Sequence, residues 1–283
     1  MPRVDTETQL CAVIGNPVEH SLSPVMHNAA FEATGLNYVY VAFRVENVGA
    51  CITGMRALPS FRGMSVTIPH KIAVMEHLDA IEPMARHVGC VNTVTNDNGT
   101  LSGSITDGLG TLRAFSEAGV DFTGRSVLFI GTGGAARAVS FAMAERTDAA
   151  RITLLGRTPA HVAALADDLR AKTAMSIESG PLNALEGAMA AHDIVIQGTP
   201  VGMHPNSDAS PVPKALFRPE QIAFDMVYRP HRTRFLREAE EAGCQTIPGI
   251  EMLINQAVLQ FELWTATDAP VQAMRDAVVA ALE

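Results

Sequence analysis

The chain has 283 residues, of which 47% are hydrophobic and 5% aromatic, and its formal net charge is −9 at pH 7. A chain of this length can bury a substantial core and forms one large domain or two ordinary ones. The negative charge and the lack of a Lys/Arg-rich block argue against nucleic acid and anionic membranes as partners. An anionic substrate would therefore be captured by local hydroxyls, amides and a few cations.

The cysteines are widely scattered along the chain, at positions 11, 51, 90 and 244, without a C-x-x-C pair. This spacing predicts reduced thiols and no metal site. The first residues are polar, and no apolar run reaches the roughly 18 residues that a membrane-spanning helix needs. We therefore expect a cytoplasmic protein, and a homodimer is left open.

The first part of the chain alternates between β-rich and helical segments, which predicts an α/β domain. The expected elements are strands Thr8–Ile14, Tyr38–Val45 and Gly63–Ile68, helices Pro24–Thr34, Val48–Arg56, Lys71–Leu78 and Pro83–Val88, and a hairpin of Asn92–Thr95 with Thr100–Gly103. A helix over Asp107–Gly119 is expected to lead into the next domain.

A strand, a glycine-rich turn and a helix follow in direct succession. Val127–Ile130 is a short apolar run typical of a buried parallel strand. Gly131 allows a sharp turn, and Gly133 and Gly134 leave room for a pyrophosphate at the N-terminus of the helix that starts near Ala135. Such a turn also occurs at ordinary helix starts, so the pattern needs support from its context.

That support comes from a second apolar run, Ala150–Gly156, which ends directly before Arg157 and Thr158. An NAD site normally has a carboxylate at this place, whereas a guanidinium and a hydroxyl suit a 2′-phosphate, so the pattern favours NADP. The alternative is that Arg157 is only a solvated residue that follows a strand. Helices over residues 134–146 and 159–173 and further strands near Met175, at Asp193–Gln197 and at Ile222–Val227 complete a doubly wound sheet, and helices Gly249–Thr265 and Val271–Leu282 end the chain.

Several polar residues stand at loop positions where open α/β sheets bind ligands. Ser21 and Ser23 precede a helix and could bind a carboxylate, although Ser23 could equally be an ordinary N-cap. Lys71 follows an expected strand and could transfer a proton with a neighbouring acid, or it could be a solvated lysine. Asn92 could bind a polyol, and Asp107 could cap a helix.

With these clusters in view, the chain resembles the shikimate dehydrogenase family over nearly its whole length. The motifs that carry the resemblance occur in order, and they are Ser21–Pro24, Val66–Lys71, Val91–Thr93, Thr106–Gly108, Gly131–Ala135, Thr199–Met203, Asp225–Tyr228 and Gly249–Gln256. One such motif would mean little, but the ordered set makes coincidence improbable.

The resemblance implies reversible NADPH-dependent reduction of 3-dehydroshikimate to shikimate, in an aromatic-precursor pathway. Lys71 would transfer the proton, paired with Asp107, because an ammonium can stabilise and then protonate the oxygen of a ketone that receives a hydride. The residues that would bind the substrate are Ser21 and Ser23 at its carboxylate, and Ser65, Thr67, Asn92, Tyr228 and Gln256 around its ring.

The resemblance also implies the cofactor site and the domain plan. Residues 1–107 and 250–283 would form a substrate-binding catalytic domain, and residues 108–249 a Rossmann-like NADP-binding domain. The implied cofactor residues are Gly131, Thr132, Gly133, Gly134 and Ala135 at the pyrophosphate, Gly156, Arg157, Thr158 and His161 around the 2′-phosphate, and Met203, Met226 and Gly249 near the nicotinamide.

The chain departs from the family pattern at four positions. Ser65, Ile105 and Gly156 each stand where the family usually has Asn, and His161 stands where a second basic residue is usual. An imidazole is only partly charged near neutral pH, so we expect a weaker and more pH-sensitive preference for NADP than the family norm.

These departures keep two alternatives open. One is a quinate/shikimate dehydrogenase with relaxed NAD/NADP use, because Ser65 leaves space for a different ring substituent. The other is a nucleotide-binding regulatory homologue without turnover, which is less consistent with the presence of both Lys71 and Asp107.

Overall fold

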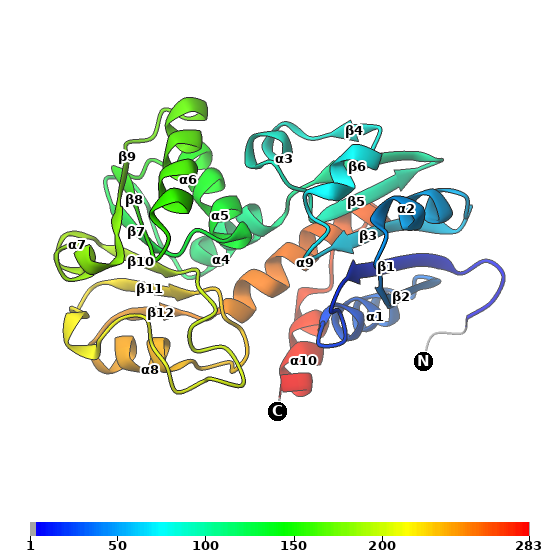
Figure 1. The fold of residues 1–283 in the computed structure, drawn as a ribbon. Coiled ribbons are helices and arrows are strands. Elements are labelled where there is room, and N and C mark those ends of the chain that lie inside the picture. The colour runs from blue at the N-terminus through cyan, green and yellow to red at the C-terminus, as the bar shows by residue number, and fades with distance from the viewer. Residues whose placement is uncertain (1–3, 283) are drawn as a thin grey trace. The chain divides into compact units, whose positions relative to one another are not determined.

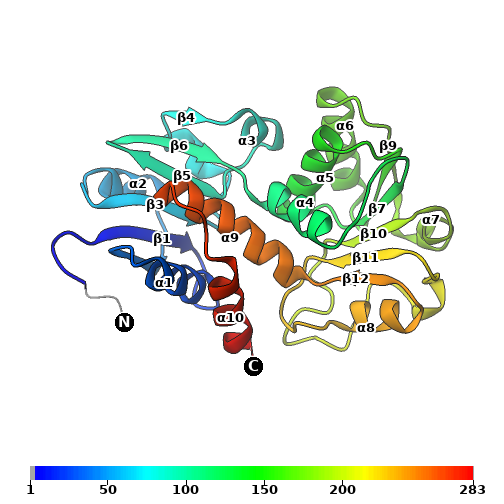
Figure 2. The same ribbon diagram turned by 180° about the vertical axis from the view of Figure 1, so that it is seen from behind.

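The computed structural model describes residues 4–282, which form two compact units (Figures 1 and 2). Unit 1 comprises the described residues up to Thr106 and from Gln256 onward, and unit 2 comprises Asp107–Asn255. The chain returns to unit 1 at Gln256, inside a long helix, whereas the boundary predicted from the sequence lies at the start of that helix. Among the described residues, no helix is both long and apolar enough to span a membrane.

Unit 1 is built on a mixed sheet of six strands, in the order β2-β1-β3-β5-β6-β4. The strands are β1 (Gln9–Gly15), β2 (Tyr38–Arg44), β3 (Phe61–Val66), β4 (Ala80–Ile81), β5 (Thr93–Asp97) and β6 (Thr100–Ser104). The pairs β1–β2 and β1–β3 are parallel, and β3–β5 and β5–β6 are antiparallel. The register places Ser65 opposite Thr93, and Thr93 opposite Ser104.

The helices of unit 1 bury their apolar faces against this sheet and each other. They are α1 (Ser23–Thr34), α2 (Val48–Arg56), the 3₁₀ helix η1 (Ala73–His77), α3 (Pro83–Val88), the second part of α9 (Gly249–Thr265) and α10 (Val271–Leu282). Trp264 on α9 is fully buried, and its Nε1 donates to the Val94 carbonyl at 3.0 Å. A Cβ at Gly63 would lie 2.2 Å from Trp264 Nε1, so the indole requires a glycine at that position.

Unit 2 is a parallel sheet of six strands in the order β12-β11-β10-β7-β8-β9. The strands are β7 (Ser126–Ile130), β8 (Arg151–Gly156), β9 (Ile177–Pro181), β10 (Ile194–Gln197), β11 (Ile222–Asp225) and β12 (Gln245–Ile247). The strand order reverses between β7 and β10, and ligands of open α/β sheets bind at the carboxyl ends of the strands at such a point. Every residue of β7 is buried, as its apolar run predicts.

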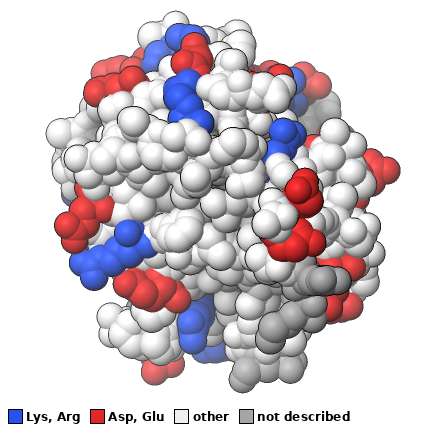
Figure 3. All heavy atoms as spheres, turned by 90° about the vertical axis from the view of Figure 1, so that its right-hand side faces the viewer, with Lys and Arg blue, Asp and Glu red and all other residues white. Residues whose placement is uncertain are grey.

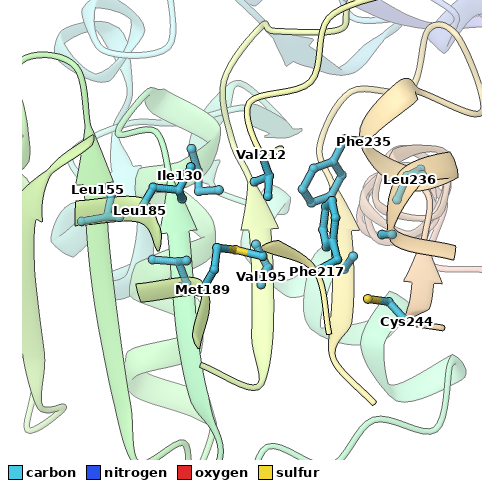
Figure 4. Close-up of a cluster of buried hydrophobic side chains, with 13 residues drawn as sticks. Ile130, Leu155, Leu185, Met189, Val195, Val212, Phe217, Phe235, Leu236 and Cys244 are labelled. Atoms are coloured by element: carbon cyan, nitrogen blue, oxygen red, sulfur yellow. The ribbon is translucent and has the colours of Figure 1, made fainter. Parts of the chain in front are cut away.

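Helices cover both faces of this sheet. They are α4 (Asp107–Glu117), α5 (Gly134–Arg146), α6 (Pro159–Lys172), α7 (Leu185–Ala191) and α8 (Arg234–Glu241), with the short 3₁₀ helices η2 (Leu182–Ala184) and η3 (Lys214–Leu216). Figure 4 shows one core, in which Met189 of α7 and Phe235 of α8 cover Ile130 and Val195 of the sheet. Phe224 points to the opposite face, where it packs edge-on against Phe115 of α4.

One expected helix is wrong. The segment predicted as a helix over Lys71–Leu78 forms a turn, and only η1 follows it. The reason is tertiary, because the Lys71 carbonyl accepts from the N–H of Val91 at 2.8 Å and is therefore not used in a helical ladder. The short elements β4, α7, α8 and β12 were not predicted from the sequence.

Charged side chains on the surface are mixed in sign. On the face seen in Figure 3, Lys and Arg lie scattered among Asp and Glu, and the residues described there form no large patch of one sign. This face offers no extended electrostatic footprint of the kind that a polyanion would need.

Candidate active site

The glycine turn of unit 2 lies at the point where the strand order reverses. Gly131 follows β7 with a φ of +107°, and a Cβ there would lie 2.8 Å from the Gly198 carbonyl oxygen after β10. Gly133 is the N-cap of α5, and a Cβ added at Gly133 or Gly134 would meet nothing within 4 Å. The backbone N–H groups at the start of α5 therefore border open space, which suits an anionic group.

Three polar side chains stand at the end of β8. Arg157, Thr158 and His161 are exposed, and Thr158 makes no capping hydrogen bond to α6 although it is the N-cap residue. Gly156 before them is buried, and a Cβ there would lie 2.8 Å from Val162 Cγ2. Val162 thus fills the space into which a side chain at position 156 would project.

The loop after β10 is held by Gln197, which is fully buried. Its amide oxygen accepts from the N–H and the hydroxyl of Thr199 at 2.8 and 2.9 Å. Its Nε2 donates to the carbonyls of Thr199 and Val201, both at 2.9 Å. Met203 follows this loop with its side chain exposed.

The loop after β11 is held by Asp225, which has no solvent exposure. Its carboxylate accepts from the Thr233 hydroxyl at 2.6 Å and from the Val227 N–H at 2.9 Å. Burial raises the pKa of Asp225 to about 7, against the opposing effect of these two donors. A Cβ at Gly249 would lie 2.6 Å from the Asp225 carbonyl oxygen, so the start of α9 approaches this loop closely.

The same loop carries Met226 and Tyr228, which are both half-buried. Burial also raises the pKa of the Tyr228 hydroxyl, while Arg229 lowers it by a smaller amount. Unit 2 therefore brings the glycine turn and the loops after β8, β10 and β11 to the carboxyl edge of one sheet.

In unit 1, the two serines lie at the start of α1. The N-cap of α1 is Leu22, which makes no capping hydrogen bond with its side chain. Ser23 is inside the helix and buried, and its N–H donates to the Ser21 hydroxyl at 3.3 Å. The alternative in which Ser23 is a plain N-cap is therefore wrong.

Lys71 lies in the turn that follows β3. Thr67 precedes this turn, and its N–H donates to the Ile14 carbonyl at 2.9 Å. His70 is buried and lies with Nε2 2.7 Å from the Val45 carbonyl oxygen, which ties the turn to the end of β2. Thr67 and Lys71 themselves are half-buried.

Ser65 lies in a buried polar cluster that joins strands β2 and β3 to α9. Its hydroxyl accepts from the Tyr40 hydroxyl at 2.7 Å and donates to Gln260 Oε1 at 2.9 Å. Gln260 Nε2 donates to the Thr93 hydroxyl at 2.9 Å. Tyr40 and Gln260 were missed in the sequence analysis, because no local pattern links them to Ser65.

Asn92 lies at the other end of this cluster, and it is buried. Its Nδ2 donates to the Thr106 hydroxyl at 3.0 Å, and its Oδ1 accepts from the Thr106 N–H at 2.9 Å. The Thr106 hydroxyl also lies 3.4 Å from Gln256 Oε1. The structure thus brings Ser65, Asn92 and Gln256 together in unit 1. Asp107, the first residue of α4, is buried and belongs to unit 2.

The fold and these polar sites define a class of protein: an α/β oxidoreductase with a doubly wound nucleotide-binding unit and a separate unit rich in buried polar groups for a small substrate. Comparison with known proteins specifies the family. A model described as the shikimate dehydrogenase substrate binding domain matches residues 13–94, one described as shikimate / quinate 5-dehydrogenase matches 113–220, and one described as the shikimate 5′-dehydrogenase C-terminal domain matches 249–279.

Similar proteins match over almost the full length. The NADP(+) shikimate dehydrogenase of Methanothermobacter thermautotrophicus is 44% identical over 275 residues, which are 96% of each chain. A crystal structure of shikimate dehydrogenase with NADP+ is 36% identical with a TM-score of 0.94, covering 99% of this chain and 98% of the other. The Thermus thermophilus enzyme, solved with NADP(H) and shikimate, is 37% identical with a TM-score of 0.86, covering 97% and 100%. The chain belongs to the shikimate dehydrogenase family.

Proposed function

We propose that the protein catalyses the reversible NADPH-dependent reduction of 3-dehydroshikimate to shikimate. The observation that carries the proposal is the full-length likeness to NADP(+) shikimate dehydrogenases, including a solved enzyme with shikimate and NADP(H) bound. Each of the two ligands of that enzyme has a proposed site in this chain. The open glycine turn of unit 2 suits NADP(H), and the buried polar cluster of unit 1 suits shikimate.

The residues of unit 2 fit a dinucleotide phosphate. The open turn at Gly133 and Gly134 suits the pyrophosphate, and the exposed Arg157, Thr158 and His161 suit the 2′-phosphate. NADPH, when bound, supplies the hydride. The other cofactor residues that we propose are Gly131, Thr132, Ala135, Gly156, Met203, Met226 and Gly249.

In unit 1, we assign substrate binding to the polar residues around the buried cluster. Ser21 and Ser23 lie at the start of α1, where hydroxyls and backbone N–H groups can bind a carboxylate. The remaining substrate residues that we propose are Ser65, Thr67, Asn92 and Gln256 of unit 1, and Tyr228 of unit 2.

Lys71 and Asp107 are the proposed pair for proton transfer. Reduction of the ketone builds negative charge on its oxygen, which the Lys71 ammonium stabilises and then protonates. In the oxidation of shikimate, the neutral amine of Lys71 accepts the hydroxyl proton. Asp107 is the acidic partner that we propose for Lys71 in this step.

The two alternatives are less well supported. Among the solved structures, two shikimate dehydrogenases with NADP bound are 36% and 37% identical to the chain, whereas a quinate dehydrogenase from Corynebacterium glutamicum with NAD is 28% identical. The Ser65 hydroxyl already donates to Gln260, so the smaller side chain does not leave a free donor for an additional ring substituent. Nothing in the site favours a regulatory homologue without turnover.

The test measures the rate at which the wild type and Lys71→Ala form NADPH from shikimate and NADP, monitored by the absorbance of NADPH. We expect the variant to lose roughly 10²-fold or more in turnover, as is typical when a general acid–base group is removed. Lys214→Ala is the matched control, because Lys214 is exposed and pairs with Glu241 on the surface of unit 2. A Lys71→Ala variant as fast as the wild type would refute the proton-transfer assignment, and an inactive wild type would refute the reaction.

Two further expectations concern the protein in the cell. We propose a cytoplasmic location, which the scattered spacing of the cysteines supports because reduced thiols persist in reducing compartments. A homodimer stays a prediction, and light scattering of the purified protein tests it.

A further inference from the structure

Two glutamines of unit 2 are buried at opposite edges of its parallel sheet. Gln197 is the last residue of β10, at the carboxyl edge, and Gln221 directly precedes β11, at the amino edge. Their exposed fractions are 0% and 2%. A buried amide has to be hydrogen-bonded, so the partners of each glutamine show which part of the chain it holds.

The amide of Gln197 has all of its hydrogen-bonding capacity used by the loop that follows β10. Its Oε1 accepts twice from Thr199, and its Nε2 donates to the carbonyls of Thr199 and Val201, at 2.8 to 2.9 Å. An amide has two lone pairs and two N–H protons, so none is left over. Three of the four partner groups belong to the main chain, where an N–H only donates and a carbonyl only accepts. The loop therefore fixes a single orientation of the amide.

The loop is folded over this amide by further bonds of its own. The Thr199 hydroxyl, which donates to Gln197, accepts from the Val201 N–H at 3.2 Å. The Met203 N–H donates to the Pro200 carbonyl at 3.2 Å. Residues 199–203 thus form consecutive turns with the Gln197 amide at their centre.

The same loop packs against the glycine turn after β7 and the helix that follows it. A Cβ at Gly131 would lie 2.8 Å from Thr199 Cγ2, so the Thr199 methyl occupies the space of a side chain there. A Cβ at Gly198 would lie 2.9 Å from the Cβ of Ala136, in the first turn of α5. The shape of the loop is therefore coupled to the backbone that borders the open space at the start of α5.

We propose that Gln197 is a positioning residue for the NADP site, because its amide holds the loop after β10 in the shape that receives the cofactor. Gln197 is not among the residues that we assign to cofactor contact. The loop that it holds carries Met203, assigned to the nicotinamide, and packs on Gly131, assigned to the pyrophosphate. The inference rests on the proposed function, since it takes these residues as cofactor residues.

The physical basis is the cost of ordering a loop when a ligand binds. A loop that is already ordered loses little conformational entropy on binding, whereas a loop that becomes ordered only with the ligand lowers the affinity. Gln197 supplies both donors and acceptors to the loop, so an apolar side chain cannot replace it. Its amide thus increases the affinity for NADP(H) without touching the cofactor.

Gln197→Met tests this role, because it replaces the amide by a thioether of similar length. We expect the Kd for NADPH, measured by fluorescence titration, to rise about tenfold or more, since ordering the backbone of one residue already costs about that factor in affinity. The KM for shikimate at saturating NADP should stay near the wild-type value. The titration needs no turnover, so it reads cofactor binding directly.

Gln221→Met is the matched control, because it removes an equally buried amide from the other edge of the sheet. Gln221 Nε2 donates to the carbonyls of Met189 and His192, both at 2.9 Å, and its Oε1 accepts from the Arg218 N–H at 2.8 Å. We expect a loss of stability in urea similar to that of Gln197→Met, with an unchanged Kd for NADPH. A merely structural role of Gln197 would make the two variants alike in both measurements.

Thr199→Val is the second variant, and it is milder. It removes the hydroxyl that bonds to Gln197 and Val201 and keeps the methyl group that packs on Gly131. We expect the Kd for NADPH to rise about threefold to tenfold, in line with one or two neutral hydrogen bonds. This variant keeps the test decisive if Gln197→Met does not fold.

Two results would overturn the inference. One is an unchanged Kd for NADPH in Thr199→Val and in a folded Gln197→Met. The other is a rise in Gln221→Met as large as that in Gln197→Met. Failure of the proposed function shows separately, as a wild type that binds NADPH but does not oxidise shikimate with NADP.

Discussion

The buried carboxyl of Asp225 leads to a quantitative prediction about stability and pH. Its pKa in the folded protein is about 7 because of burial, against an ordinary value of 3.8. At a pH between these two values, Asp225 keeps its proton in the folded protein and loses it in the unfolded chain. The free energy of unfolding therefore falls as the pH rises from about 4 to about 7. The difference corresponds to about 4 kcal/mol in total, since one pKa unit is about 1.4 kcal/mol.

Asp225→Asn removes this titration and keeps the shape of the site. The Asn oxygen can accept from the Val227 N–H, and the Thr233 hydroxyl can turn to accept from the new amide. Of the total effect, about 2.5 kcal/mol falls between about pH 5 and about pH 8, so the stability of the variant relative to the wild type should rise by that amount over this range. Urea unfolding followed by circular dichroism at several pH values measures it.

Asp193→Asn is a control with the opposite sign. Burial acts to raise the pKa of Asp193, but hydrogen bonds from the N–H and the hydroxyl of Ser126, at 2.8 and 2.7 Å, help to lower it on balance. Its contribution to stability is therefore present above the ordinary carboxyl pKa and is lost as the pH falls through the lowered value. A stability difference between the wild type and Asp225→Asn that stays constant from about pH 5 to about pH 8 would refute the reasoning on Asp225.

Two further predictions concern glycines. Gly63→Ala should lower the free energy of unfolding by about 3 kcal/mol or more, because the new Cβ would lie 2.2 Å from the Trp264 ring, which is itself hydrogen-bonded to the Val94 carbonyl. Gly54→Ala, in α2 with open space around it, should instead stabilise the protein by about 0.5–1 kcal/mol in the same urea assay. Gly156→Asn should lower the melting temperature, because the new side chain would collide with Val162. Adding Val162→Ala should restore the melting temperature and tighten NADPH binding, measured by fluorescence titration. A Gly156→Asn single variant as stable as the wild type would contradict this prediction.

The nucleotide-binding sheet could be predicted from the sequence, because its determinants are local. The β7 strand is a continuous apolar run, and Gly131 follows it directly, so strand and turn can be recognised without knowing what packs against them. The order of the motifs along the chain was enough to indicate the shikimate dehydrogenase family. The expected helix over Lys71–Leu78 failed where a local signal was overridden by a distant partner, the N–H of Val91.

The tertiary structure alone decided what the polar groups of the site do. Ser65, Thr93 and Gln260 are far apart in sequence, and only the pairing of β3 with β5 and the return of α9 to unit 1 bring their hydrogen bonds together. The same holds for Asp225, whose raised pKa comes from the elements that enclose it. Residue type and local pattern fix which groups a chain can offer for chemistry. The direction of a hydrogen bond and the cost of burying a charge depend on neighbours in space, so they appear only once the chain is folded.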